Sequence, residues 1–122
     1  MNTNVQTFTS EHKLLIGESS KGRIIKTSAI VYLEADDNYC RVYLEGNQEI
    51  VVCRTLRSYE EELNPNVFFR CHKSYLVNIL HIREYHNRKN EFIIVLQDNT
   101  MIKVARRRVS ELKKFLHAQF SK

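Results

Sequence analysis

Three consecutive arginines near the end of the chain are the densest group of side chains that could do chemistry. The guanidinium of Arg106, Arg107 or Arg108 presents a planar fork of donors that fits two phosphate oxygens, or the O6 and N7 atoms of guanine. The triplet follows an apolar run and begins the last helical pattern, so these cations lie at a strand-to-helix junction. Positive charge at a helix N-terminus opposes the helix dipole, which is a mild indication of function. The alternative is a solvated basic turn.

A second polar group interrupts an apolar stretch in the middle of the chain. Arg70, Lys73 and Ser74 surround Cys71 and His72, with aromatic and aliphatic residues on both sides. A polar segment between two buried runs is typical of a loop that projects outward with a defined shape. From such a loop, Lys73 and Ser74 can donate to phosphates or to base edges.

A third group, residues 36–41, offers one cation beside several polar atoms. Its acidic and amide residues at 36–38 favour a turn, and Tyr39, Cys40 and Arg41 begin the alternating pattern of a strand. None of the three groups is specific by itself. All three lie where an apolar run meets a turn, which indicates loops held by a β framework.

The sequence offers no catalytic group and no metal site. Cys71 and His72 are adjacent, so on a strand their side chains point to opposite faces and cannot form a thiol–base pair. Asp36 and Asp37 are consecutive turn formers, and the histidines and cysteines lack the paired spacing of zinc ligands. The absence of a glycine-rich phosphate loop excludes most nucleotide-binding enzymes. We therefore expect a non-enzymatic protein with no cofactor and no metal.

Short β-strands must position these groups, because most apolar residues come in short runs bounded by turn residues. Nine strands are expected, at residues 14–16, 23–25, 30–35, 39–44, 50–53, 68–70, 75–77, 92–96 and 101–105. Ser58 with Glu61 matches a capping box and predicts a short helix whose Leu56, Tyr59 and Leu63 share one face. A C-terminal amphipathic helix is predicted by apolar residues at helical spacing, at positions 109, 112, 115, 116 and 120.

Length and charge narrow the class of protein further. The 122 residues suffice for one compact domain. Residues 1–69 carry seven Lys and Arg against ten Asp and Glu, a net charge of −3, whereas residues 70–122 carry twelve against four, a net charge of +8. A basic half points to a polyanionic partner. There is no signal peptide and no apolar run long enough to span a membrane, and three cysteines without paired spacing indicate reduced thiols in a cytoplasmic protein.

Taken together, the sequence resembles the LytTR-type DNA-binding domain over about residues 12 to 118. The matching segments, in order along the chain, are residues 30–39, 55–56, 69–78 and 102–107. Residues 69–78, which read FRCHKSYLVN, are the most specific of them.

The resemblance implies a mainly β fold: an elongated stack of short antiparallel β-sheets with a short central helix and a C-terminal amphipathic helix. It implies that loops, in place of a recognition helix, enter successive major grooves of double-stranded DNA. The base-reading side chains would then be Arg41, Lys73 and Arg107. Cys40 stands where some members have histidine, and since a thiol is a poor base reader, contact there would pass to Arg41 or Tyr39. The expected backbone contacts are Tyr39, Arg70, Ser74, Arg106 and Arg108, and the expected loop-shaping residues are His72, Tyr75 and Asn78.

The domain organisation and partners follow from the same resemblance. Residues 1–11 are polar without periodicity and read as a disordered leader or linker stub, and residues 12–120 as the DNA-binding domain. Most members carry a receiver domain that is phosphorylated on an aspartate, and they regulate transcription. We expect a stand-alone regulator, or an output domain separated from an upstream receiver domain or sensor kinase, that binds repeated sites as a homodimer.

Two alternatives stay open at this point. A single-stranded nucleic-acid-binding β domain would need exposed aromatic side chains to stack on bases, for which Tyr32, Tyr39 and Tyr43 are the candidates. A protein-interaction module would use the acidic first half of the chain.

Overall fold

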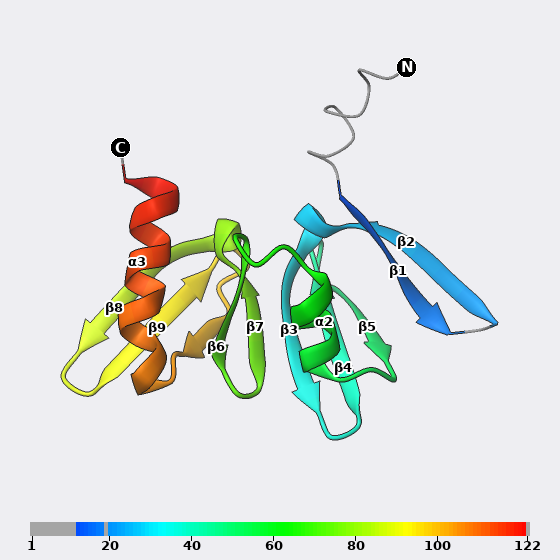
Figure 1. Ribbon diagram of the computed structural model, residues 1–122, viewed down its shortest axis with the longest axis horizontal. Coiled ribbons are helices and arrows are strands. Elements are labelled where there is room, and N and C mark those ends of the chain that lie inside the picture. Colours follow the sequence, from blue (N-terminus) through cyan, green and yellow to red (C-terminus); the bar gives the residue numbers. More distant parts are fainter. Residues whose placement is uncertain (1–11, 19, 122) are drawn as a thin grey trace, which may run out of the picture.

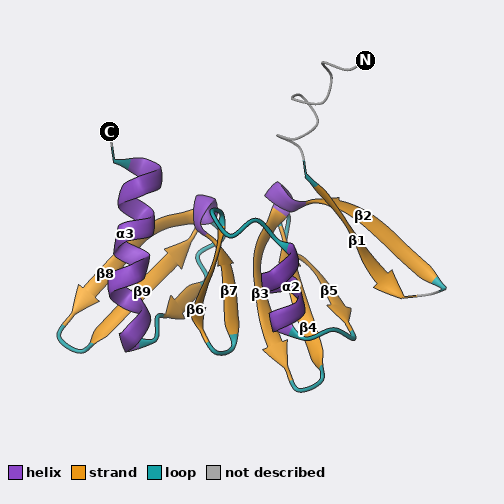
Figure 2. Ribbon diagram, in the orientation of Figure 1, coloured by secondary structure: helices purple, strands orange, loops and turns teal. Residues whose placement is uncertain are grey.

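The computed structural model describes residues 12–18 and 20–121, and within them the chain forms ten β-strands, two α-helices and three 3-10 turns. The strands make three antiparallel sheets of two, five and three strands, arranged side by side along the longest axis of the molecule (Figure 1). The two α-helices lie against the sheets (Figure 2). The mainly β, elongated fold that we expected is confirmed. The leader expected at residues 1–11 lies outside the described residues.

The central sheet has the order β5-β4-β3-β7-β6. Its strands are β3 (Ile30–Asp36), β4 (Tyr39–Leu44), β5 (Gln48–Val52), β6 (Phe68–His72) and β7 (Tyr75–Asn78). Strand β4 shows the predicted alternation, because Cys40 and Val42 are fully buried while Tyr39 is exposed. Strand β3 is buried on both faces, since Leu33 belongs to the core on one side of the sheet and Val31 to the core on the other.

Two smaller sheets flank the central one. The hairpin of β1 (Lys13–Glu18) and β2 (Lys21–Lys26) packs Leu14, Ile16 and Ile25 into the core that contains Leu33, which we call the first core. The core that contains Val31 is the second core. The other sheet has the order β10-β9-β8, with β8 (Ile82–Arg88), β9 (Glu91–Leu96) and β10 (Met101–Lys103). Strand β8 was not among the nine predicted strands. It is an edge strand whose side chains are exposed or half-buried, so its sequence lacks the apolar alternation that identifies a strand.

The short helix α2 (Leu56–Glu62) carries the apolar face that we predicted, with Leu56, Tyr59 and the following Leu63 all buried. Its predicted cap at Ser58 was wrong. Thr55 is the N-cap, and its Oγ1 accepts a hydrogen bond from the Ser58 backbone N–H at 3.1 Å. The Ser58 hydroxyl donates in return to the Thr55 carbonyl at 2.8 Å, so the serine sits inside the first turn.

The C-terminal helix α3 (Val109–Phe120) covers the second core, as its spacing predicted. Leu112 is buried, and Phe115 packs on Phe69 with ring centroids 5.2 Å apart. The arginine triplet forms a separate 3-10 turn, η3 (Arg106–Arg108), between β10 and α3. The helix therefore begins after the triplet, and the three cations occupy the connection itself.

Candidate nucleic-acid interface

Three turns that are far apart in sequence lie along one edge of the molecule. The β3–β4 turn, the β6–β7 turn and η3, at the start of α3, follow one another along the lower edge in Figure 1. Two backbone hydrogen bonds tie them together: Ala35 N–H donates to the Ser74 carbonyl at 2.9 Å, and Ala105 N–H donates to the Cys71 carbonyl at 2.8 Å. The β6–β7 turn is therefore the centre of the row and is bonded to its neighbour on each side.

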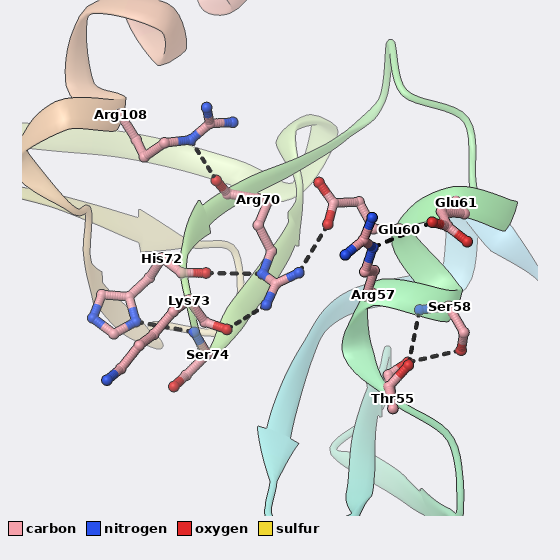
Figure 3. A network of polar contacts seen from close by, with 10 residues as sticks. All are labelled: Thr55, Arg57, Ser58, Glu60, Glu61, Arg70, His72, Lys73, Ser74 and Arg108. Atoms are coloured by element: carbon pink, nitrogen blue, oxygen red, sulfur yellow. Dashed lines mark hydrogen bonds and ion pairs between the residues drawn. The ribbon is translucent and has the colours of Figure 1, made fainter.

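The side chain of Arg70 contacts the backbone of the β6–β7 turn (Figure 3). Its Nε donates to the His72 carbonyl at 3.0 Å, and one terminal nitrogen donates to the Lys73 carbonyl. Its other terminal nitrogen pairs with Glu60 of α2 at 2.8 Å, and the side chain is only 24% exposed. All three nitrogen groups of Arg70 are thus engaged inside the protein. We expected Arg70 at the DNA backbone, but its contacts are those of a residue that fixes the loop.

His72 and Tyr75 close the same loop from its two ends. His72 Nδ1 accepts from the Ser74 backbone N–H at 3.1 Å, and the His72 and Tyr75 rings pack with centroids 5.8 Å apart. The Tyr75 hydroxyl donates to Glu34 at 3.2 Å, and Tyr43 donates to the other oxygen of the same carboxylate at 3.1 Å. The histidine and the tyrosine thus both make contacts within the loop, and the loop-shaping role that we expected for them stays a prediction.

Asn78 anchors the far end of β7. Its amide donates to the Ile30 carbonyl at 2.9 Å, its carbonyl oxygen accepts from Leu80 N–H at 2.9 Å, and it is 1% exposed. A buried amide with both groups satisfied fixes the pairing of β7 against the start of β3. Its effect on the loop is therefore exerted through the strand.

Arg108 joins η3 to the β6–β7 hairpin. Its Nε donates to the Arg70 carbonyl at 2.9 Å, as Figure 3 shows, and its guanidinium lies over the Phe69 ring, 4.7 Å from the centroid. A terminal nitrogen also pairs with Glu111 at 2.7 Å. Like Arg70, this side chain is occupied within the protein, although we expected it too at the DNA backbone.

Lys73 and Arg107 are the cations that these contacts leave available. Both are exposed, and within the described part of the chain neither side chain makes a hydrogen bond or ion pair. They line one open hollow of about 450 Å³, which we call the β6–η3 hollow; its lining is Glu60, Arg70, His72, Lys73, Ala105, Arg107 and Arg108. Its single carboxylate, Glu60, is neutralised by Arg70. Two of the three predicted base readers are therefore brought together.

The third predicted base reader, Arg41, lies on β4 next to the β3–β4 turn and is engaged by carboxylates. Its Nε pairs with Asp36 at 2.9 Å and a terminal nitrogen with Glu49 at 2.7 Å, and its side chain is 37% exposed. The neighbouring Cys40 is completely buried and cannot meet a ligand. Tyr39, at the tip of the turn, is 49% exposed.

The aromatic residues considered as stacking platforms are mostly covered. Tyr32 is buried and stacks on Tyr43, with ring centroids 4.3 Å apart. Tyr43 is half-buried and bonded to Glu34. Of these three tyrosines, Tyr39 alone offers an exposed ring.

The thiols of Cys40 and Cys71 are both buried. Burial raises the pKa of Cys40 to about 11 and that of Cys71 to about 12, so both are protonated at neutral pH. Among residues 12–18 and 20–121 no group of three or more His, Cys, Asp or Glu side chains is arranged to hold a metal ion. Nor does any helix in that part of the chain combine the length and apolar character needed to cross a membrane.

Sequence reasoning did not identify the two acidic residues on which the loop depends. Glu60 belongs to an acidic triplet on α2 that reads as a solvated helix face, yet it anchors Arg70. Glu34 lies in an apolar strand, where its isolated carboxylate in an otherwise buried run was the available signal. Both supply negative charge that orders the turn, Glu60 through Arg70 and Glu34 through Tyr75.

A mainly β domain with exposed cations such as Lys73 and Arg107, unpaired within the described residues, along one edge has the form of a nucleic-acid-binding domain. The comparison with protein families gives the same class, because the LytTr DNA-binding domain family matches residues 20–117. The chain belongs to this family of DNA-binding domains of transcriptional regulators.

Individual relatives are transcriptional or sensory regulators of bacteria. The chain is 29% identical over 116 residues to the sensory transduction protein LytT of Bacillus subtilis, covering 94% of this chain and 48% of that protein. It is 27% identical over 106 residues to the CO-responsive transcriptional regulator RcoM of Rhodospirillum rubrum, covering 85% and 44%. It is 33% identical over 99 residues to the transcriptional regulatory protein YpdB of Escherichia coli, covering 78% and 40%. The chain thus spans less than half the length of these relatives.

A solved structure shares the fold. The LytTr DNA-binding domain of a response regulator from Bacillus cereus superposes with a TM-score of 0.74 at 24% sequence identity. The superposition covers 85% of this chain and 95% of that one.

Proposed function

We propose that this domain recognises specific sequences in double-stranded DNA and regulates transcription by binding them. In this proposal the β3–β4 turn, the β6–β7 turn and η3 enter successive major grooves. Lys73 and Arg107 read base edges from the β6–η3 hollow, where their chemistry suits the O6 and N7 acceptors of guanine. The domain itself has no enzymatic activity and acts through the positions that it occupies on DNA.

The observation that carries this proposal is the contrast between the engaged and the free cations along one edge. Arg70 and Arg108 donate hydrogen bonds to backbone carbonyls of the β6–β7 hairpin. Lys73 and Arg107, by contrast, are exposed and have no polar partner in the described chain. Because hydrogen bonds hold the backbone of these turns in place, binding has to order the Lys73 and Arg107 side chains but not the loops that carry them, which favours recognition.

Arg41 is a conditional base reader in this scheme. Asp36 and Glu49 hold it beside the β3–β4 turn, and the approach of DNA would repel both carboxylates. The guanidinium can then exchange a carboxylate for a base edge or a phosphate, since both offer a pair of acceptors. Of the five expected phosphate contacts we keep Tyr39 at the start of β4, Ser74 on the β6–β7 turn and the exposed Arg106 of η3, whereas Arg70 and Arg108 act by holding the loops.

The regulator as a whole extends the proposal beyond the domain. We infer that two copies bind repeated sites as a homodimer on DNA, and that a receiver domain or sensor kinase lies upstream in the signalling path. The relatives named above include a sensory transduction protein and transcriptional regulators, which supports this assignment. Binding to bacterial chromosomal DNA would place the protein in the cytoplasm.

The proposal is tested by selecting bound duplexes from a random pool and then measuring Kd on the selected duplex and on its scrambled sequence. Lys73→Ala and Arg107→Ala should each cost about 1–3 kcal/mol on the selected duplex, because a base contact is lost, and much less on the scrambled one. Lys21→Ala, which removes an exposed lysine from the distant β1–β2 hairpin, is the matched control. Equal losses on the two duplexes for Lys73→Ala would contradict base reading by that loop. Tighter binding to the matching single strand would favour a single-stranded function instead.

A further inference from the structure

A second hollow lies on the other side of η3 from the β6–η3 hollow. It has a volume of about 480 Å³, and we call it the β8–β9 hollow. The residues that line it are Asn87, Lys89, Asn90, Glu91, Phe92, Val104, Arg106, Val109, Ser110 and Lys113. It is thus formed by the β8–β9 turn on one side and by η3 with the first turn of α3 on the other.

Two consecutive arginines of η3 line different hollows. Arg106 lines the β8–β9 hollow, whereas Arg107 lines the β6–η3 hollow. The 3-10 turn therefore stands between two cationic depressions and contributes one free guanidinium to each. The β8–β9 turn also lies at the same edge of the molecule as the three turns described above, beyond the start of α3 (Figure 1).

The β8–β9 hollow carries a positive charge that the protein does not neutralise. Lys89 and Arg106 are exposed and have no hydrogen bond or ion pair within the described chain, and Lys113 Nζ lies over the Phe92 ring, 5.8 Å from its centroid. Glu91, its single carboxylate, pairs with Lys103 at 3.7 Å, outside the hollow.

The neutral polar groups of the hollow are donors of the kind that contact phosphate. Asn87, Asn90 and Ser110 line it without a hydrogen bond from their side chains to any described residue. Side-chain amides and hydroxyls beside cations are common phosphate contacts in DNA complexes. Lys89 adopts φ +43°, so the turn presents this lysine from a left-handed conformation that the hairpin imposes.

We infer that the β8–β9 hollow binds the phosphodiester backbone of the same DNA duplex, as a fourth contact segment that does not read sequence. This inference rests on the proposed function and adds to it a segment, the β8–β9 turn, that the expected site residues did not include. Arg106 then belongs with Lys89 and Lys113 in one phosphate site, and the protein's footprint extends past η3.

The test compares two double variants of equal charge change on a fluorescent duplex of mixed sequence. Lys89→Gln with Lys113→Gln removes two cations from the hollow, and Lys13→Gln with Lys21→Gln removes two lysines from the β1–β2 hairpin. Kd is measured by fluorescence anisotropy over a series of salt concentrations. Circular dichroism confirms that each variant is folded.

Each phosphate contact contributes about 0.9 to the slope of log K against log salt, so the hollow variant should lose about 1.8 of that slope and bind roughly tenfold more weakly at low salt. The hairpin variant should keep the slope of the unaltered protein. If the two variants show the same slope and affinity, the β8–β9 hollow does not bind DNA while the proposed function stands. If the unaltered protein itself fails to bind the duplex, both proposals fall.

Discussion

The arginine side chains near the proposed interface fall into two groups: some hold the loops in place through hydrogen bonds, and others are exposed and available to a ligand. Arg70 and Arg108 satisfy backbone carbonyls of the β6–β7 hairpin and pair with Glu60 and Glu111. A guanidinium has five donors on three nitrogens in a rigid fork, so it can bind acceptors that lie in several fixed directions, whereas the three donors of an ammonium share one nitrogen. Residue type alone does not reveal which arginine has which task, because the task depends on where the carbonyls and carboxylates lie.

The role of Arg70 can be tested by a conservative replacement. If Arg70 positions the loop, both Arg70→Lys and Arg70→Ala should weaken binding to the selected duplex to a similar extent, since lysine cannot reproduce the three directed contacts. Each should also lower the free energy of unfolding by about 1–3 kcal/mol, because loop carbonyls lose a charged partner. Denaturant unfolding and anisotropy titrations measure the two effects. Recovery of affinity by Arg70→Lys would show instead that the residue is a simple phosphate contact.

Helix α2 acts on the interface at the scale of an element, because it holds Glu60 against Arg70. Its first turn depends on the Thr55 cap. We predict that Thr55→Ala lowers the free energy of unfolding by about 1 kcal/mol, as removal of an N-cap usually does, and that Thr55→Ser retains most of it. Urea unfolding of the two variants provides the measurement. Equal destabilisation by alanine and serine would contradict the capping role.

The elements that the sequence predicted well are those whose residues alternate between core and solvent. Strand β4 and helix α3 followed from such patterns because one face of each is buried, whereas β3, buried on both faces, followed from its continuous apolar run. Strand β8 escaped prediction because its hydrogen bonds to β9 need no particular side chains on an exposed edge. The cap was misplaced because Ser58 has Glu61 three residues on and fits the capping-box pattern, whereas Thr55, the residue that precedes the first turn, lacks that signal.

The free cations Lys73 and Arg107 were predicted for the interface from their residue types and from the resemblance, and the structure brings them into one hollow. The engagement of Arg41, Arg70 and Arg108 could not be predicted, since it depends on partners up to 38 residues away. The β8–β9 hollow was not predicted for the same reason: Lys89 and Lys113 are far apart in sequence, and only the folded chain places both in the lining of one hollow.

At the scale of the whole molecule, buried cysteine thiols and tyrosine hydroxyls make the stability of the fold depend on pH. Burial raises the pKa of Cys40 to about 11 and of Cys71 to about 12, from 9.0 in a free thiol, and it also raises the pKa of Tyr32 and Tyr75. The unfolded chain loses these protons at a lower pH than the folded one. Their contribution to stability is therefore complete below pH 9.0 and is lost as the pH rises towards 12.

We predict that the melting temperature falls progressively as the pH rises from about 9 towards 12, as scanning calorimetry can measure. Cys53→Ser should leave this profile unchanged because the Cys53 thiol is exposed. Cys71→Ala should flatten the profile, even though the lost side chain lowers stability at every pH. A melting temperature that does not change between about pH 9 and pH 12 would contradict the burial argument.

The row of turns along one edge is the central claim, and cleavage of DNA by a tethered iron chelate tests it most directly. Asn38→Cys, Ser74→Cys and Ser110→Cys, each in a Cys53→Ser background, place one reactive thiol at the β3–β4 turn, the β6–β7 turn and the first turn of α3, directly after η3, while Cys40 and Cys71 stay buried. On the selected duplex we predict three cleavage centres in that order along each bound site, with the centre from position 74 in the middle. Cleavage from one turn alone, or centres in no consistent order, would contradict a single DNA-binding edge.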